Sequence, residues 1–316
     1  MNNNRAIYLD NIAGFFILYM MVMHSCLFIG ETSYQYVGKF IYFFMAWFFY
    51  KGGVFFNPQS DISEYIKVSF RRLMIPYIIF STIGLGINIV FGLADGHSLG
   101  FLILSSIKSL ANTGTVCGES GHLWFLLGLF ISRILLYLSN KYNVLKISLF
   151  ISVLLVLLLH HLGLKHFWWI LYSVTGFLYY GLGYFLREKQ YDKLIFFISA
   201  IVYVISIILP ANFNQYNTQV YQGTIEVAII YAVFACVCFC NVGKYLLNHK
   251  TILCVISKYA MLLYVVHYPV MCAISKTGIL SNMNNFYAIV LLNSISIICV
   301  AIIVIIFKDK LNKIGL

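Results

Sequence analysis

The first long apolar stretch of this sequence has one ionisable side chain just before it and another inside it. Residues 12–30 are almost wholly apolar, with Asp10 just before them and His24 well inside them. About 20 helical residues cross a bilayer core of about 30 Å. Fourteen residues of helix would place the two side chains about 21 Å apart along the axis and about 40° apart around it. Because an ionisable group at this depth is costly, we expect His24 to face the bundle interior and to serve a reaction or a transport pathway.

Two further histidines, His122 and His267, fall on the same side of the membrane as His24 in the predicted topology. The alternative for each is a structural ring that is hydrogen-bonded to a neighbour. For His267 that neighbour would be a carbonyl group freed by Pro269. A third group is predicted to lie in an outer loop, solvated or, as an alternative, binding a metal ion: His160, His161 and His166.

Basic residues gather at the opposite side, where the stretch KVSFRRLMIPYIIF opens an apolar run. Arg71 and Arg72 are either anchors at the cytoplasmic surface or ligands for a phosphorylated molecule, because guanidinium groups match phosphate oxygens. Arg133 lies eleven residues after His122, which predicts one shared helix face with a charge near each membrane surface. Lys51 is predicted to extend to the inner surface.

The composition is that of an integral membrane protein. Hydrophobic residues make up 61% of the 316-residue chain and charged residues 10%, and the mean hydropathy is +0.88. A soluble domain carries about 25% charged residues. The net charge of +11 comes from basic residues scattered at helix ends, which indicates membrane topology and argues against nucleic-acid binding. The eight cysteines lie mostly in apolar runs, so no disulfide framework is expected.

The predicted fold is all-α: a single bundle of about ten transmembrane helices that forms one domain over residues 1–316. With both termini in the cytoplasm, 15 of the 21 basic residues fall inside, four fall outside and two lie within spans. The spans are predicted at residues 12–30, 38–56, 73–93, 122–139, 147–163, 168–186, 194–210, 224–242, 257–276 and 285–307.

Two long connections are predicted on the outer side. Residues 94–121 contain SLGFLILSSIKSL, which is apolar enough to lie on the interface or to dip into the membrane. Residues 212–223 are uncharged and rich in Asn, Gln and Tyr. They suit carbohydrate hydroxyls and are equally ordinary loop residues.

Five segments, in order along the chain, resemble the membrane-bound acyltransferase-3 family, most closely its fucose 4-O-acetylase-like branch. The segments are LDNIAGFFILYMMVMHS, FFMAWFFYKGGVFF, RRLMIPYIIFS, HLWFLLGLFISR and SKYAMLLYVVHYPV. They span residues 5–270. The matching positions include Asp10, Gly14, His24, Met45, Phe48, Phe49, Gly52, Arg71, Arg72, Pro76, Tyr77, Ser257, Tyr264, His267 and Pro269.

Three positions depart from the family pattern. Ala13 replaces a basic residue that the family pairs with the histidine, Ala46 replaces a proline, and Lys51 replaces a serine. Lys51 or Arg5 could supply the missing charge.

The resemblance implies transfer of an acyl group, most often acetyl, from cytosolic acyl-CoA to a hydroxyl group. The acceptor would be a cell-envelope or exopolysaccharide glycan, or its lipid-linked precursor, at the bacterial inner membrane. His24 would be the general base or, as an alternative, a transient acyl carrier. Asp10 would orient a partner near the inner mouth, and Arg71 and Arg72 would bind the CoA phosphates. The acceptor side would use His122, Trp124, Tyr264 and His267, and no metal ion is expected.

Two other classes of protein remain open at this point. A multi-pass transporter for an anionic sugar or a lipid-linked precursor would show inverted repeats or broken helices in both halves, and the sequence shows neither. A membrane sensor or scaffold without catalytic activity is kept open by Ala13. Binding or hydrolysis of acyl-CoA would separate the enzyme from both.

Overall fold

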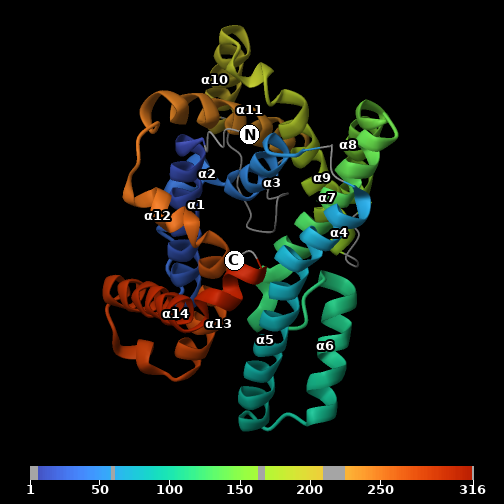
Figure 1. Ribbon diagram of the computed structural model, residues 1–316. Helices are drawn as coiled ribbons and strands as arrows, with labels where there is room; N and C mark the ends of the chain where they lie inside the picture. The colour runs from blue at the N-terminus through green and yellow to red at the C-terminus, as the bar shows by residue number, and fades with distance from the viewer. Residues whose placement is uncertain (1–5, 58–60, 163–167, 209–224, 315–316) are drawn as a thin grey trace.

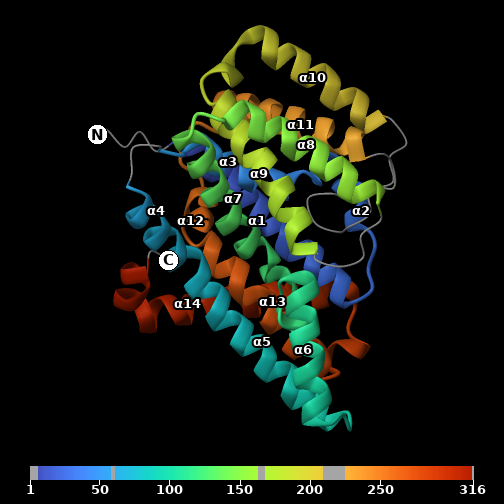
Figure 2. The ribbon, with the colours of Figure 1, turned by 90° about the vertical axis from the view of Figure 1, so that its right-hand side faces the viewer.

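The computed structural model describes residues 6–57, 61–162, 168–208 and 225–314, and all regular secondary structure in these ranges is helical. The first helix, α1 (Ile7–Phe28), runs through the bundle (Figures 1 and 2). It is surrounded by helices from the other end of the chain. These are α11 (Ile225–Leu246), α12 (Ile252–Lys258), α13 (Ala260–Lys276) and α14 (Asn285–Ile314).

The close approach of α12 to α1 depends on Gly14. A Cβ atom at this position would lie 2.1 Å from the carbonyl oxygen of Leu253. No larger side chain fits without moving one of the two backbones. The glycine of the family-like opening segment therefore has a packing role.

A second group of helices packs beside the first. It is formed by α3 (Phe44–Val54), α7 (Trp124–Lys141) and α9 (Trp168–Leu186), with α8 (Leu145–His161) against α9. The α3–α9 crossing is close because a Cβ atom on Gly53 would lie 1.8 Å from the carbonyl oxygen of Tyr180. Figure 2 shows α10 (Lys193–Ile208) beyond α11 at one edge of the bundle.

The third part is a long helical run that leads into a hairpin. It comprises α4 (Ile62–Ser69), the π-helical turn η1 (Phe70–Met74) and α5 (Ile75–Ala94). The Asp61 side chain caps α4 by accepting hydrogen bonds from the backbone N–H groups of Ser63 and Glu64. The apolar middle of residues 94–121 is the helix α6 (Leu99–Thr113), which folds back beside α5 (Figures 1 and 2). Its outward face is apolar, as expected for contact with lipid.

The all-helical membrane architecture is confirmed, and the count of ten spans stays a prediction. In the described ranges five helices are long and apolar enough to cross a membrane, or six if the bent pair α12–α13 is one span. Two shorter helices, α2 (Tyr34–Ile41) and α3, occupy the region predicted as the span 38–56. The α12–α13 pair bends by 75° inside the predicted span 257–276. Arg5, His166 and residues 212–223 lie outside the described residues.

Candidate active site

Three histidines predicted from separate parts of the chain meet in the structure. His24 lies on α1, His267 on α13 and His122 on the 3-10 turn η2 (Gly118–Leu123). The rings of His24 and His267 are nearly parallel, with planes within 9° and centroids 5.0 Å apart. The ring of His122 meets that of His267 edge-on at 5.4 Å. His267 is therefore the central ring of the three.

A chain of hydrogen bonds fixes which nitrogen atoms carry protons. His267 Nδ1 lies 2.8 Å from the carbonyl oxygen of Leu263, which can only accept, so Nδ1–H is the donor. In the neutral ring His267 Nε2 is then an acceptor. It lies 2.8 Å from His24 Nδ1, which must donate to it. This leaves Nε2 of the neutral His24 ring as an unprotonated nitrogen, which is the state required of a base.

The His267 ring does not bond to the carbonyl group that the sequence analysis suggested, which is the one freed by Pro269. Pro269 has no N–H group, so the carbonyl group of Val265 loses its usual donor four residues on. The His267 ring bonds to the Leu263 carbonyl, not to the one that Pro269 frees. The Val265 carbonyl lies near the ring of His122, outside hydrogen-bonding geometry.

His122 has a fixed main chain and an uncommitted ring. The Tyr264 hydroxyl donates a hydrogen bond to its carbonyl oxygen, and its ring stacks on Tyr268 with centroids 4.9 Å apart. The residue is 5% exposed, and neither ring nitrogen has a hydrogen-bond partner among the described residues. Unpartnered buried nitrogens are rare in native structures, and a catalytic role, a bound water molecule or a ligand can account for them.

A second contact between η2 and α13, besides that of Tyr264, is an ion pair. Lys276 Nζ donates to Glu119 Oε1 at 2.7 Å, and the Glu119 residue is 8% exposed. The sequence did not single out Glu119, because a lone acidic residue in a loop carries no pattern. Its location three residues before His122 makes it part of the support for that ring.

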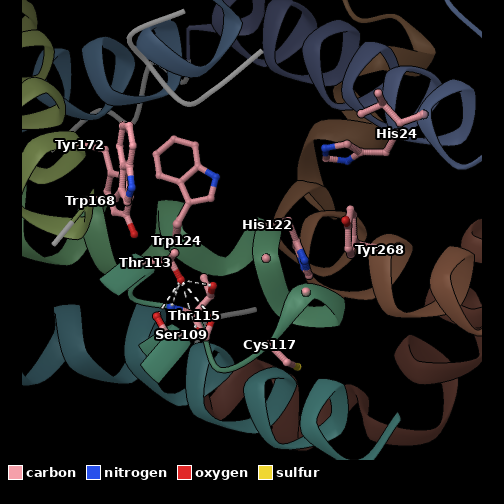
Figure 3. Close-up of a pocket in the computed structure, with 13 residues that line it drawn as sticks. His24, Ser109, Thr113, Thr115, Cys117, His122, Trp124, Trp168, Tyr172 and Tyr268 are labelled. Atoms are coloured by element: carbon pink, nitrogen blue, oxygen red, sulfur yellow. Dashed lines mark hydrogen bonds between the residues drawn. The ribbon is translucent and has the colours of Figure 1, made fainter. Parts of the chain in front are cut away.

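Two of the three histidines, His24 and His122, line a cavity of about 680 Å³, and His267 lies buried behind them. Figure 3 shows histidines and Tyr268 at one end, with Trp124, Trp168 and Tyr172 at the other. The Tyr172 hydroxyl group is buried and has no partner in the described chain. Linked hydroxyl groups form one side, where Thr113 Oγ1 lies 2.8 Å from Thr115 Oγ1 and 3.3 Å from Ser109 Oγ. The cavity therefore combines aromatic faces with hydrogen-bonding groups.

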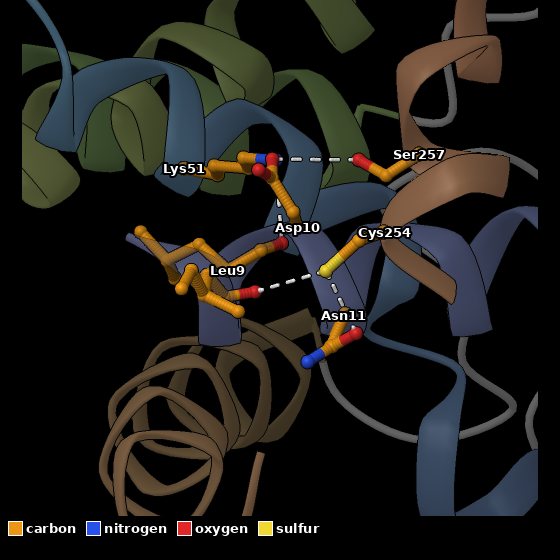
Figure 4. A network of polar contacts seen from close by, with 7 residues as sticks. Leu9, Asp10, Asn11, Lys51, Cys254 and Ser257 are labelled. Atoms are coloured by element: carbon orange, nitrogen blue, oxygen red, sulfur yellow. Dashed lines mark hydrogen bonds and ion pairs between the residues drawn. The ribbon is translucent and has the colours of Figure 1, made fainter. Parts of the chain in front are cut away.

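Asp10 lies at the other end of α1 and has a different role. Its Oδ1 atom is 3.6 Å from Lys51 Nζ and accepts a hydrogen bond from Ser257 Oγ at 3.5 Å (Figure 4). Lys51 Nζ also donates to the carbonyl oxygen of Leu9 at 3.3 Å. The suggested replacement for the missing basic residue at Ala13 thus pairs with Asp10, far from His24.

Asn11, next to Asp10, is a buried junction that the sequence analysis missed. Its Nδ2 donates to the carbonyl oxygens of Leu247 and His249 at 2.6 and 2.7 Å. Its Oδ1 accepts from Thr251 Oγ1 at 2.6 Å and from Cys254 Sγ at 3.0 Å. These contacts fasten α1 to the segment that leads into α12. They join residues about 240 positions apart, so no local pattern could reveal them.

Arg71 and Arg72 both lie in the π-helical turn η1, and their side chains are exposed. They line different cavities. Arg71 borders one of about 700 Å³ beside α4, whereas Arg72 borders one of about 360 Å³. The second cavity is also lined by Arg133 from α7.

A family model described as an acyltransferase domain, Acyl_transf_3, matches residues 6–307. The chain belongs to the acyltransferase-3 family. Searches of curated proteins and of solved structures return no match. Together with its apolar helices, the family makes this protein a multi-pass membrane acyltransferase.

The remaining candidate ligands of a metal ion in this acyltransferase are not assembled in the described residues. His161 Nε2 lies 3.0 Å from Glu226 Oε1 on the surface. In the described ranges, no three His, Cys, Asp or Glu side chains gather in a way that could hold a metal ion. All eight cysteines are free thiols.

Proposed function

We propose that this acyltransferase moves an acyl group, in the simplest case acetyl, from cytosolic acyl-CoA to a hydroxyl group of a saccharide. The acceptor would be a cell-envelope or exopolysaccharide glycan, or its lipid-linked precursor, at a bacterial inner membrane. The fucose 4-O-acetylase-like segments of the sequence support this substrate class. The observation that carries the proposal is the unprotonated Nε2 of His24, which lines a cavity rich in aromatic and hydroxyl groups.

In this proposal His24 acts as the general base. Its Nε2 removes the proton from the acceptor hydroxyl as the oxygen attacks the carbonyl carbon of the thioester. The tetrahedral intermediate then collapses, the C–S bond breaks, and the imidazolium returns its proton to the leaving thiolate. His267 accepts the Nδ1–H hydrogen bond and stabilises the imidazolium. Base catalysis of this kind contributes roughly 10²–10⁴ in rate.

The cavity suits a sugar ring better than an apolar acceptor. The rings of Trp124, Trp168 and Tyr172 offer apolar faces with polar edges. The free nitrogens of His122 and the Tyr172 hydroxyl group are unpaired in the described chain, and sugar hydroxyls would satisfy them. The transporter alternative lacks such a supporting observation, because the family match points to an enzyme.

Transfer from radiolabelled acetyl-CoA tests this proposal directly. Purified full-length protein would be given acetyl-CoA and a lipid-linked saccharide extract from the expressing cells, and label in the saccharide would be counted. We expect His24→Ala to lose at least about a hundredfold in rate. CoA binding should persist, because the base does not hold the donor.

The control is His97→Ala, which removes an exposed imidazole outside the cavity. It should transfer label as the wild type does. A His24→Ala protein that transfers at near the wild-type rate would end the general-base assignment. A wild type that releases no thiol from acetyl-CoA and labels no saccharide would overturn the proposed reaction.

A further inference from the structure

A charged side chain lies midway along the membrane helix α7 without an ionic partner. Arg133 is the tenth of the 18 residues of α7 and is half-buried. Within the described ranges it forms no salt bridge. Its Nε donates to the Tyr65 hydroxyl at 3.4 Å, and its guanidinium lies over the Tyr65 ring at 5.2 Å. A charge in a membrane helix usually faces a cavity with a function, because its burial is costly.

The Arg133 side chain borders a cavity that holds a second arginine. The cavity of about 360 Å³ lies between α3, α4, η1, α7 and α9 and is also lined by Arg72. Glu64 contributes a carboxylate to the lining, and it is exposed. The terminal amino groups of Arg133 have no hydrogen-bond partner among the described residues, so they remain available to a ligand.

The two arginines that the sequence treats as a pair both lie in the π-helical turn η1 but face different cavities. Successive residues of a helix point about 100° apart, so Arg71 and Arg72 do not face the same way. Arg72 lines the Arg133 cavity, and Arg71 lines its neighbour beside α4. Single π-helical turns occur often at functional sites.

We propose that Arg72 and Arg133 together form the binding site for the phosphate groups of the acyl donor, with Arg71 outside it. The proposal rests on the proposed function, since it locates the donor of that reaction. Two guanidinium groups at one cavity suit the charge and fork geometry of a phosphate ester. Gly52, adjacent to the Lys51 that pairs with Asp10, also lines this cavity, which places it at the end of α1 opposite His24.

The position of the two cavities defines the shape of the ligand. Trp124 lines the histidine cavity and Arg133 the arginine cavity, nine residues apart on α7. Nine helical residues correspond to about 13.5 Å along the axis. A donor bound by its phosphates at Arg133 therefore needs a long arm to bring its thioester to His24. Coenzyme A, with its pantetheine arm, has this form.

Calorimetric titration of CoA into the detergent-solubilised full-length protein tests the site. We expect Arg133→Gln and Arg72→Gln each to weaken CoA binding by about tenfold to a hundredfold, because charge-assisted hydrogen bonds to phosphate are lost. Arg71→Gln should change it by about twofold or less, as for an exposed charge without a partner. Pantetheine, which lacks the phosphates, should bind all four proteins equally.

Thermal unfolding checks that Arg133→Gln folds, and Arg133→Lys provides a second variant that keeps the charge. The lysine variant should bind CoA more weakly than the wild type and more tightly than the glutamine variant. Equal losses in Arg71→Gln and Arg133→Gln would overturn this site and leave the proposed reaction intact. A wild type that transfers acetyl groups but binds pantetheine as tightly as CoA would also overturn it. Failure of both CoA binding and transfer would overturn the proposed function as well.

Discussion

The two ends of α1 hold their polar residues in opposite ways. At the Asp10 end, Asn11 makes four polar contacts, and Asp10 is paired with Lys51 and Ser257. At the His24 end, His24 keeps one ring nitrogen open, and His122 keeps two without a partner among the described residues. At the Asp10 end the polar side chains have hydrogen-bond partners within the protein. At the His24 end ring nitrogens remain that a ligand could bond to.

Buried polar groups with partners and those without partners have different effects on stability and on ligand binding. A buried polar group with all its partners stabilises the fold, because hydrogen bonds within the protein replace those that it loses to water. A buried polar group without partners lowers stability, and a ligand that supplies the missing hydrogen bonds gives it a use. Asp10 stands just before the apolar stretch and His24 well inside it, and in the structure their partners distinguish them further.

After the loss of His24 itself, the largest effect should come from breaking the hydrogen bond between His24 and His267. His267→Leu removes the acceptor for His24 Nδ1–H, so the imidazole loses both its fixed tautomer and the stabilisation of its charged form. We expect the maximal acyl-transfer rate to fall by about tenfold to a hundredfold, less than for His24→Ala. The pH–rate profile should shift, whereas CoA affinity should stay unchanged.

The double variant makes this prediction sharper. In a His24→Ala background, His267→Leu should cost little further rate, because the two residues act as one unit. His267→Gln, which can still accept a hydrogen bond, should recover part of the loss. An unchanged pH–rate profile in His267→Leu would reduce His267 to a packing residue.

The next effect concerns the Asp10 end. Asn11→Ala removes the buried amide that donates to the carbonyl groups of Leu247 and His249 and accepts a hydrogen bond from Thr251. Each hydrogen bond of this kind contributes roughly 0.5–1.5 kcal/mol, and several are lost together. Thermal unfolding in detergent should show this loss, while the protein that remains folded keeps its transfer rate. A variant with normal stability and lost activity would contradict the division between the two ends.

The sequence could predict that His24 faces the bundle interior, but it could not predict which residues contact it. The depth of His24 in an apolar run was enough to identify it, since burial of an imidazole is costly wherever the run packs. Its partner His267 lies 243 residues away, and the contact depends on tertiary packing. The same limit explains Asn11 and the location of Arg71 and Arg72 at two different cavities, which depends on the helices packed against η1. Hydropathy likewise predicted spans where the structure has short or bent helices, because it does not report where a helix breaks.

A smaller effect is expected at the support of His122. Glu119→Gln removes the charge from the pair with Lys276, whose side chain is 31% exposed. Partly exposed pairs contribute about 1 kcal/mol or less, so stability should change little. Because Glu119 lies three residues before His122, we expect a raised apparent KM for the acceptor with an unchanged KM for acyl-CoA. Steady-state kinetics with both substrates varied would show this, and equal changes in the two KM values would contradict it.

The smallest effect is expected for Glu31→Gln. Glu31 lies at the His24 end of α1 but outside the cavity, and it has hydrogen-bond partners. Glu31 follows α1 at this end, and its carboxylate accepts hydrogen bonds from the backbone N–H groups of Ser33 and Thr32 and from Asn285 Nδ2. These bonds, with that from Ser33 contributing most, hold the pKa of Glu31 below its ordinary value of 4.5. Since the folded-state pKa is lowered, their stabilisation is present above pH 4.5 and is lost as the pH falls through the folded-state value. Thermal unfolding of the wild type and Glu31→Gln should therefore differ near neutral pH and converge in acid. A difference independent of pH would show that the charge of Glu31 adds nothing to the stability that its hydrogen bonds give.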